Sequence, residues 1–137
     1  MGTKTPWHVW VVGILSLLWD GSGAYTIVSA QHQAIALKPD EAAYYAAQAP
    51  WFVVLVDIGL ATAVLGAIAL LLRKRWAVWL FAISLALILF GDCYDLAMGT
   101  SRAYANNVAA AVTLLIAVLA ALQLYYANAM AKRGVLT

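Results

Sequence analysis

The fold is decided by residues 51–97, which read WFVVLVDIGLATAVLGAIALLLRKRWAVWLFAISLALILFGDCYDLA. Two long apolar runs stand on either side of one basic triplet, Arg73-Lys74-Arg75. Each run has about 20 residues, the length that an α-helix needs to cross a hydrocarbon core of about 30 Å. The stretch therefore predicts two membrane-spanning helices joined by a tight turn.

One further apolar run lies before this stretch and one lies after it. Of the 137 residues, 66% are hydrophobic and 10% are charged, whereas a soluble domain carries about 25% charged residues. Lipid offers no water to satisfy backbone groups, so the spans must be helices. We predict an all-α, integral membrane, four-helix up-down bundle that forms a single transmembrane domain over residues 1–137. Its spans are about 7–29, 51–72, 76–97 and 103–127.

The loop between the first two spans is the longest. Within it, Lys38-Pro39-Asp40-Glu41 is typical of a helix start, because proline fits the first turn and acidic residues favour the positive end of the helix dipole. We predict a short helix here, in the first extracytoplasmic loop and over the mouth of the bundle. No cleaved signal peptide is expected, because the first apolar run is too long and its interior too polar.

Basic residues are distributed unequally between the two ends of the spans. Six of the eight fall on one side, and Lys38 and Arg102 fall on the other. Because basic residues collect in cytoplasmic loops, we expect both termini in the cytoplasm and the protein in the inner (plasma) membrane. The six are Lys4, Arg73, Lys74, Arg75, Lys132 and Arg133.

Four of the six acidic residues, all aspartates, lie inside apolar spans. A charged side chain there costs about 2.5 to 3.5 kcal/mol, and it usually faces the bundle interior. The helical rise places Asp20 about 20 Å, and Asp92 and Asp95 about 24 and 28 Å, from the cytoplasmic face. Asp57 lies about 9 Å from the opposite face. All four are thus predicted at one level, in the outer half of the membrane.

Further polar side chains occur at this level, and we predict that they join the aspartates around one acidic pocket that opens outward. Asp92 and Asp95 are three residues apart and so share a helix face. Crowded carboxylates need either protons or a cation, and such oxygens suit a hard metal ion or an organic amine. The identity of any metal or cofactor is unknown from the sequence. The predicted pocket residues are Asp20, Asp57, Asp92, Asp95, Asn106, Tyr94 and Tyr25.

A second interpretation of the aspartates stays open. Polar side chains in spans also hold helices together through interhelical hydrogen bonds. In addition, Asp20-Gly21-Ser22-Gly23 could interrupt the first span, with Asp20 capping a new turn. On this interpretation the aspartates are structural.

Small residues recur along the spans at spacings that suit close helix contacts. Gly59, Ala63 and Ala67 could serve inside the bundle or between protomers, so a homo-oligomer is one expectation. The stripe expected to face inward in the fourth span holds Asn106, Ala110, Thr113, Ala117 and Ala121.

Several classes of function are not expected. The single cysteine, Cys93, excludes an internal disulfide and a cysteine-cluster metal site. No nucleophile–base pair and no metal-ligand set appears, so we do not expect an enzyme. Basic residues are not interleaved with aromatic ones, so no nucleic-acid partner is expected.

Three segments carry a resemblance to a known group of proteins. They are Gly13-Ile14-Leu15-Ser16-Leu17-Leu18-Trp19 with Gly23-Ala24-Tyr25, Ala49-Pro50-Trp51, and Leu70-Leu71-Leu72-Arg73-Lys74-Arg75-Trp76-Ala77 with Phe81-Ala82-Ile83-Ser84-Leu85. In these segments the chain resembles small four-helix bacterial inner-membrane proteins of undefined function, some of them labelled sugar transporters. The resemblance covers roughly three quarters of the chain and implies a four-helix membrane fold. It supplies no catalytic residues, and the group carries asparagine where this chain has Asp20.

The sequence therefore favours a small membrane protein whose acidic, outward-facing pocket binds or transports a cation, a proton or a small solute. The alternative is an accessory or scaffold subunit of a larger membrane complex, with no ligand of its own. The lipid bilayer is the expected partner in both cases, together with a second copy of the chain or a larger complex. The hypothesis of a binding pocket predicts that neutralising Asp92 or Asp95 abolishes binding. The hypothesis of an accessory subunit predicts that the protein tolerates aspartate-to-asparagine changes.

Overall fold

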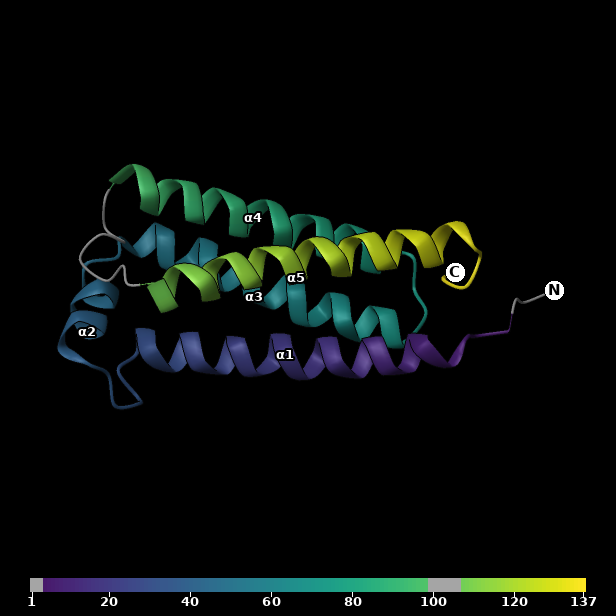
Figure 1. The fold of residues 1–137 in the computed structure, drawn as a ribbon, viewed down its shortest axis with the longest axis horizontal. Coiled ribbons are helices and arrows are strands. Elements are labelled where there is room, and N and C mark those ends of the chain that lie inside the picture. The colour runs from purple at the N-terminus through teal and green to yellow at the C-terminus, as the bar shows by residue number, and fades with distance from the viewer. Residues whose placement is uncertain (1–3, 99–106) are drawn as a thin grey trace.

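The computed structural model describes residues 4–98 and 107–137, and all regular elements within these residues are α-helices. Four of the five helices, all except α2, are long and apolar enough to cross a membrane. The chain therefore has the makeup of a multi-pass membrane protein. The helices are α1 (Trp7–Gln31), α2 (Pro39–Ala46), α3 (Pro50–Leu71), α4 (Trp76–Met98) and α5 (Asn107–Lys132) (Figure 1).

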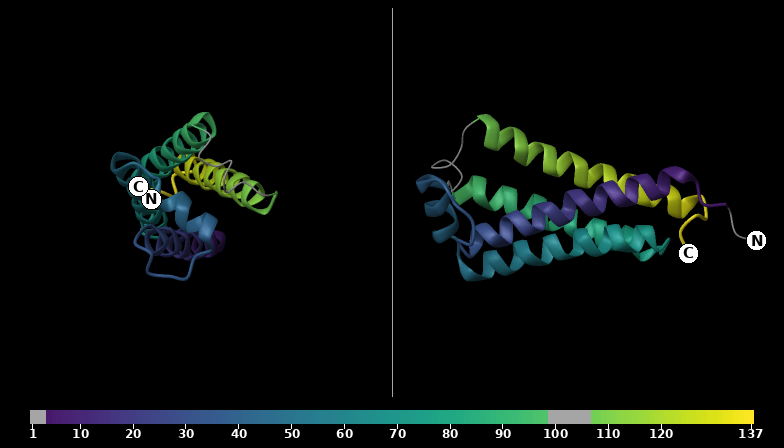
Figure 2. Two further views of the ribbon diagram at one scale, coloured as in Figure 1. Left: turned by 90° about the vertical axis from the view of Figure 1, so that its left-hand side faces the viewer. Right: turned by 90° about the horizontal axis from the view of Figure 1, so that it is seen from below.

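The four long helices lie side by side, and the short helix α2 lies at one end of them (Figure 1). Both termini lie at the opposite end (Figures 1 and 2). Helix α3 packs against α1 on one side and α4 on the other, and α4 packs in turn against α5. We call the two ends the α2 end and the basic end, the latter defined by Arg73, Lys74, Arg75, Lys132 and Arg133.

Helices α1, α3 and α4 begin and end within two residues of the predicted spans. The fourth span differs, since it was predicted over residues 103–127 and α5 runs on to Lys132. Its first predicted residues, 103–106, lie outside the described part of the chain. The predicted span ends at Ala127, just after the paired aromatic residues Tyr125 and Tyr126, but good helix formers follow. The helix ends only before Gly134, which adopts a positive φ of 75°.

Helix α1 continues unbroken through Asp20-Gly21-Ser22-Gly23. The interpretation in which Asp20 starts a new turn is therefore wrong. A glycine costs about 1 kcal/mol in a helix interior, whereas a break in lipid leaves backbone groups unpaired at several kcal/mol each. The Ser22 hydroxyl is accommodated by donating a hydrogen bond to the Trp19 carbonyl at 3.0 Å.

Helix α2 begins at the proline of the Lys38-Pro39-Asp40-Glu41 segment. The Glu41 carboxylate accepts a hydrogen bond from the backbone N–H of Lys38 at 3.1 Å. Asp40 accepts one from the N–H of Glu41, also at 3.1 Å. The acidic side chains thus satisfy donors at the helix start that the helix itself leaves unpaired.

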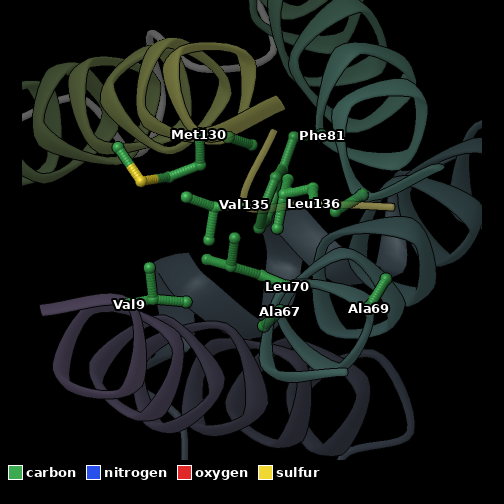
Figure 3. Packing of buried hydrophobic residues seen from close by; sticks show 10 residues of the cluster. Val9, Ala67, Ala69, Leu70, Phe81, Met130, Val135 and Leu136 are labelled. Carbon is green, nitrogen blue, oxygen red and sulfur yellow. The ribbon is translucent and has the colours of Figure 1, made fainter. Parts of the chain in front are cut away.

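The buried hydrophobic cluster lies at the basic end (Figure 3). It includes Val9 from α1, Leu70 from α3, Phe81 from α4 and Met130 from α5. Each of these side chains is at most 3% exposed. Four helices therefore meet closely here.

The segment after α5 closes this end of the bundle. Val135 and Leu136 turn back into the cluster (Figure 3) and are 5% and 2% exposed. The backbone N–H of Thr137 donates to the Arg73 carbonyl at 2.8 Å, and the Arg75 N–H donates to the Thr137 carbonyl at 2.9 Å. The turn between α3 and α4 is thereby tied to the end of the chain.

The small residues of α3 are used inside the bundle. Gly59, Ala63 and Ala67 are all buried within this single chain. The Ser84 hydroxyl of α4 donates to the Gly59 carbonyl at 2.9 Å, an approach that a glycine allows. Of the two predicted uses of this stripe, the structure shows the one within the chain.

Candidate functional site

A cavity of about 170 Å³ lies at the α2 end of the bundle, and all five helices contribute to its lining. Two carboxylates, Asp92 and Asp95, reach it from α4. Most of the remaining lining is aliphatic or aromatic. The aliphatic part is Ile27, Val56, Leu60, Leu87, Ile88 and Ile116.

A second cavity of about 130 Å³ adjoins the first. The two share Tyr44, Gln48, Phe52 and Asp95 in their linings. Tyr94 lines the second cavity and stacks on Phe52, with ring centroids 5.1 Å apart. We call the two cavities together the α2-end pocket.

Helix α2 is fixed over this pocket by one strong contact. The Tyr44 hydroxyl donates a hydrogen bond to the Asp95 carboxylate. Burial raises the pKa of the Tyr44 hydroxyl far above its ordinary value, and the hydrogen bond and charge of Asp95 raise this pKa further. Tyr44 therefore stays protonated and keeps its role as donor.

The charged side chains in the described lining of the pocket are both acidic, Asp92 and Asp95. Among the described lining residues there is no lysine, arginine or histidine. Lys38 is exposed, and Arg102, the other basic residue expected on this side of the membrane, lies outside the described residues. In the described part of the chain, the side-chain oxygen of Gln48 is buried and has no hydrogen-bond partner. Among the described residues, the pocket thus presents one buried acceptor, the Gln48 oxygen, that has no donor.

Asp20 does not line the pocket. Its carboxylate accepts a hydrogen bond from the side-chain N–H of Gln123 at 3.0 Å, which joins α1 to α5. A second bridge between these helices joins His8 to Tyr126 nearer the basic end. For Asp20, the observed geometry is that of an interhelical hydrogen bond.

Asp57 lines neither cavity, and one of its carboxylate oxygens is buried without a partner among the described residues. Tyr25 is 71% exposed and lies on the outer surface of α1. Asn106 lies outside the described residues. The prediction of one pocket for all four aspartates therefore needs correction, because depth fixes the level of a residue but not its direction around the helix axis.

The stripe predicted to face inward in α5 is wrong at two of its positions. Thr113 and Ala121 are exposed, whereas Ala117 is half-buried, and Asn106 and the side chain of Ala110 lie outside the described part of the chain. The buried face holds Ala120 and Ala127. Alanine occurs on every face of this helix, so small size alone could not select a face.

Three residues of the site region were missed as such from the sequence. Tyr44 and Gln48 lie in and after α2, where no periodic pattern marks a pocket-facing side chain. Gln123 could have been found, because it is an amide side chain within the apolar sequence of α5.

The donor set disfavours a metal cage. No group of three or more histidine, cysteine, aspartate or glutamate residues that could hold a metal ion occurs within residues 4–98 and 107–137. Calcium takes six to eight oxygen ligands, and the side chains of the described lining offer two carboxylates, one amide and tyrosine hydroxyls. The arrangement suits a cation that needs few direct ligands, such as an ammonium group.

Comparisons of the chain with protein-family models, with curated proteins and with solved structures found no match.

Proposed function

We propose that the chain is an up-down four-helix bundle of the inner (plasma) membrane that binds a small cationic solute in the α2-end pocket. The excess of basic residues at the basic end supports an orientation with both termini in the cytoplasm. The α2 end, with its short helix in the first extracytoplasmic loop, then faces outward. A solute outside the cell would therefore meet the end that holds the pocket before it meets the basic end.

One observation carries the proposal. Asp92 and Asp95 line a largely apolar cavity in which no described lining residue is basic. Two carboxylates on one helix face repel each other, and low polarity strengthens that repulsion. A bound cation relieves it and places a positive charge beside the Gln48 oxygen.

Transport is the form of function that this site supports best. Tyr44 lines the pocket and holds α2 to Asp95, one of the same carboxylates that would bind the cation. Binding of a cation at Asp95 therefore competes with the attachment of α2. This competition links occupancy of the pocket to the position of the helix that covers it.

A second candidate function is an accessory subunit of a larger membrane complex. The Asp20–Gln123 and His8–Tyr126 bridges favour it, because in both cases a polar side chain in a span serves helix packing. On this account Asp92 and Asp95 play a comparable part, and a partner protein covers the pocket.

Native mass spectrometry of the protein released from detergent micelles tests the proposal. We compare the wild type with Asp92→Asn/Asp95→Asn, and use Asp20→Asn as the matched control, since it neutralises an intramembrane aspartate outside the pocket. The wild type and the control should carry a bound cationic molecule that the double variant loses.

The opposite result is equally clear. If all three proteins are bare and equally assembled, or if co-purifying proteins remain bound to all three, the pocket does not bind a cation. The accessory-subunit hypothesis is then the better one.

A further inference from the structure

Helix α5 is packed along only part of its length. Residues 111–115 are exposed at five consecutive positions. Since a helix turns once in 3.6 residues, five such positions cover every direction, so none of these side chains is buried against the described residues. Nearer the basic end, Ala120, Ala127 and Met130 are 7%, 0% and 3% exposed. Both views of Figure 2 show α5 diverging from the other helices toward the α2 end.

The part of α5 that diverges from the other helices borders the α2-end pocket. Ile116, directly after the exposed segment, lines the larger cavity together with Ile27 of α1. The extensive backbone packing among the described helices runs from α1 through α3 and α4 to α5. Helices α1 and α5 are joined directly by the Asp20–Gln123 and His8–Tyr126 bridges, which lie nearer the basic end than Ile27 and Ile116 do. The cavity therefore reaches the space between α1 and α5 on the α2 side of these bridges.

The chemistry of the lining changes across the cavity. Asp92, Asp95 and Gln48 place oxygens near α2, whereas Ile27, Leu60 and Ile116 make an aliphatic wall. Binding sites for drug-sized molecules measure about 300–1,000 Å³, and this cavity measures about 170 Å³. It has room for a head group, but a longer apolar tail must leave it.

We infer that the ligand is an amphipathic organic cation whose ammonium head group binds Asp92, Asp95 and the Gln48 oxygen, while its apolar tail passes Ile116 between α1 and α5 into the lipid. The inference rests on the proposed function and names its substrate class. An ammonium head group is attracted by the two carboxylates, and Tyr45 and Phe52 place aromatic rings, which attract cations, in the same lining.

Binding of tritiated octyltrimethylammonium and tetramethylammonium to the protein in nanodiscs tests the inference, with binding to empty nanodiscs subtracted. The head groups are alike, so the two ligands differ in the tail. The octyl compound should bind at least about tenfold more tightly, because a tenfold gain requires the burial of only about two methylene groups. Asp92→Asn/Asp95→Asn should lose both ligands.

The path of the tail is tested by Ile116→Trp, with Val118→Trp as the matched control. Val118 lies on the same helix, two residues further on, and is 46% exposed outside the pocket. Ile116→Trp should remove the advantage of the octyl compound and leave tetramethylammonium within about twofold, whereas Val118→Trp should change neither ligand. An unchanged melting temperature of both variants shows that they fold.

The possible results separate the inference from the function beneath it. If both ligands bind equally and both need the aspartates, the amphipathic class is wrong and the cation pocket stands. If Ile116→Trp and Val118→Trp weaken the octyl compound equally, the tail does not pass Ile116. If neither ligand depends on the aspartates, both the inference and the proposed function fail.

Discussion

The two ends of this small bundle are built in opposite ways. At the basic end, side chains from α1, α3, α4, α5 and the following segment form one buried cluster, with Leu70 and Phe81 each 1% exposed (Figure 3). At the α2 end, the described residues line the two cavities of the pocket and include buried polar atoms without hydrogen-bond partners, and α5 diverges from the other helices there (Figure 2).

The difference separates a closely packed end, which stabilises the bundle, from the end that we propose binds a ligand. In lipid, helix association depends on close packing and hydrogen bonds, because burial of apolar surface gains little. Close packing is concentrated at the basic end, which can hold the four helices together. The α2 end can then keep space and unpaired acceptors that a ligand would fill. Three pairs of substitutions examine this contrast, in order of expected effect.

The largest effect should come from truncating a phenylalanine at each end. Phe81 at the basic end and Phe52 at the α2 end are 1% and 3% exposed. Phe81→Ala should lower the free energy of unfolding by about 3 to 5 kcal/mol, since it leaves a cavity in a tightly packed cluster. Phe52 already borders two cavities, so Phe52→Ala should cost about half as much. Circular dichroism during a titration with SDS measures the free energy of unfolding of both variants. Equal losses of this free energy would contradict the difference in packing between the two ends.

A smaller effect is expected from adding one methyl group. A Cβ atom at Gly66 would lie 2.9 Å from the Phe81 ring, whereas one at Gly21 would meet nothing within 4 Å. Gly66→Ala should therefore destabilise by about 1 to 3 kcal/mol. Gly21→Ala should be neutral or stabilise by up to about 1 kcal/mol, because alanine favours the helix. Thermal denaturation in detergent gives both values, and a Gly66→Ala protein as stable as wild type would show that this end is loosely packed.

The smallest global effect should come from Tyr44→Phe, which removes the hydrogen bond to Asp95. We expect this substitution to lower the free energy of global unfolding by about 0.6 kcal/mol or less. Backbone hydrogen exchange should become faster in α2 and remain unchanged elsewhere. The control is Tyr125→Phe, because that side chain is 74% exposed and its change should leave α2 unaffected.

The same contact has a defined pH dependence. Burial raises the pKa of the Tyr44 hydroxyl above its ordinary value of 10.0. The hydrogen bond that this hydroxyl donates therefore contributes fully to stability below about pH 10, and this contribution is lost only as the pH rises above that value. The difference in α2 exchange between wild type and Tyr44→Phe should thus be equal at about pH 6 and about pH 8. A difference that disappears at the higher pH would contradict this assignment.

The sequence predicted the long helices well, because lipid allows few alternatives. Apolar runs of spanning length must be helices, and Arg73-Lys74-Arg75 marked the turn between α3 and α4. The end of α5 was less predictable, since aromatic residues at a membrane interface do not by themselves stop a helix.

The site was predicted only in part, for a geometric reason. Asp92 and Asp95 share one helix face, so their spacing alone indicated that they would lie together. Asp20 and Asp57 lie on other helices, and their direction depends on how each helix is rotated in the bundle. The rotation is set by packing partners such as Gln123, which the level of a residue in the membrane does not reveal.

The central claim, that the α2 end binds a cation while the other polar contacts are structural, is tested most directly by labelling the carboxylates of the wild-type protein. Dicyclohexylcarbodiimide, an apolar reagent for carboxylic acids, is applied in nanodiscs with and without octyltrimethylammonium, and labelled peptides are mapped by mass spectrometry. The account predicts that the cation suppresses labelling of Asp92 and Asp95 and leaves that of Asp20 unchanged. Labelling of Asp92 and Asp95 that the cation does not affect would contradict it.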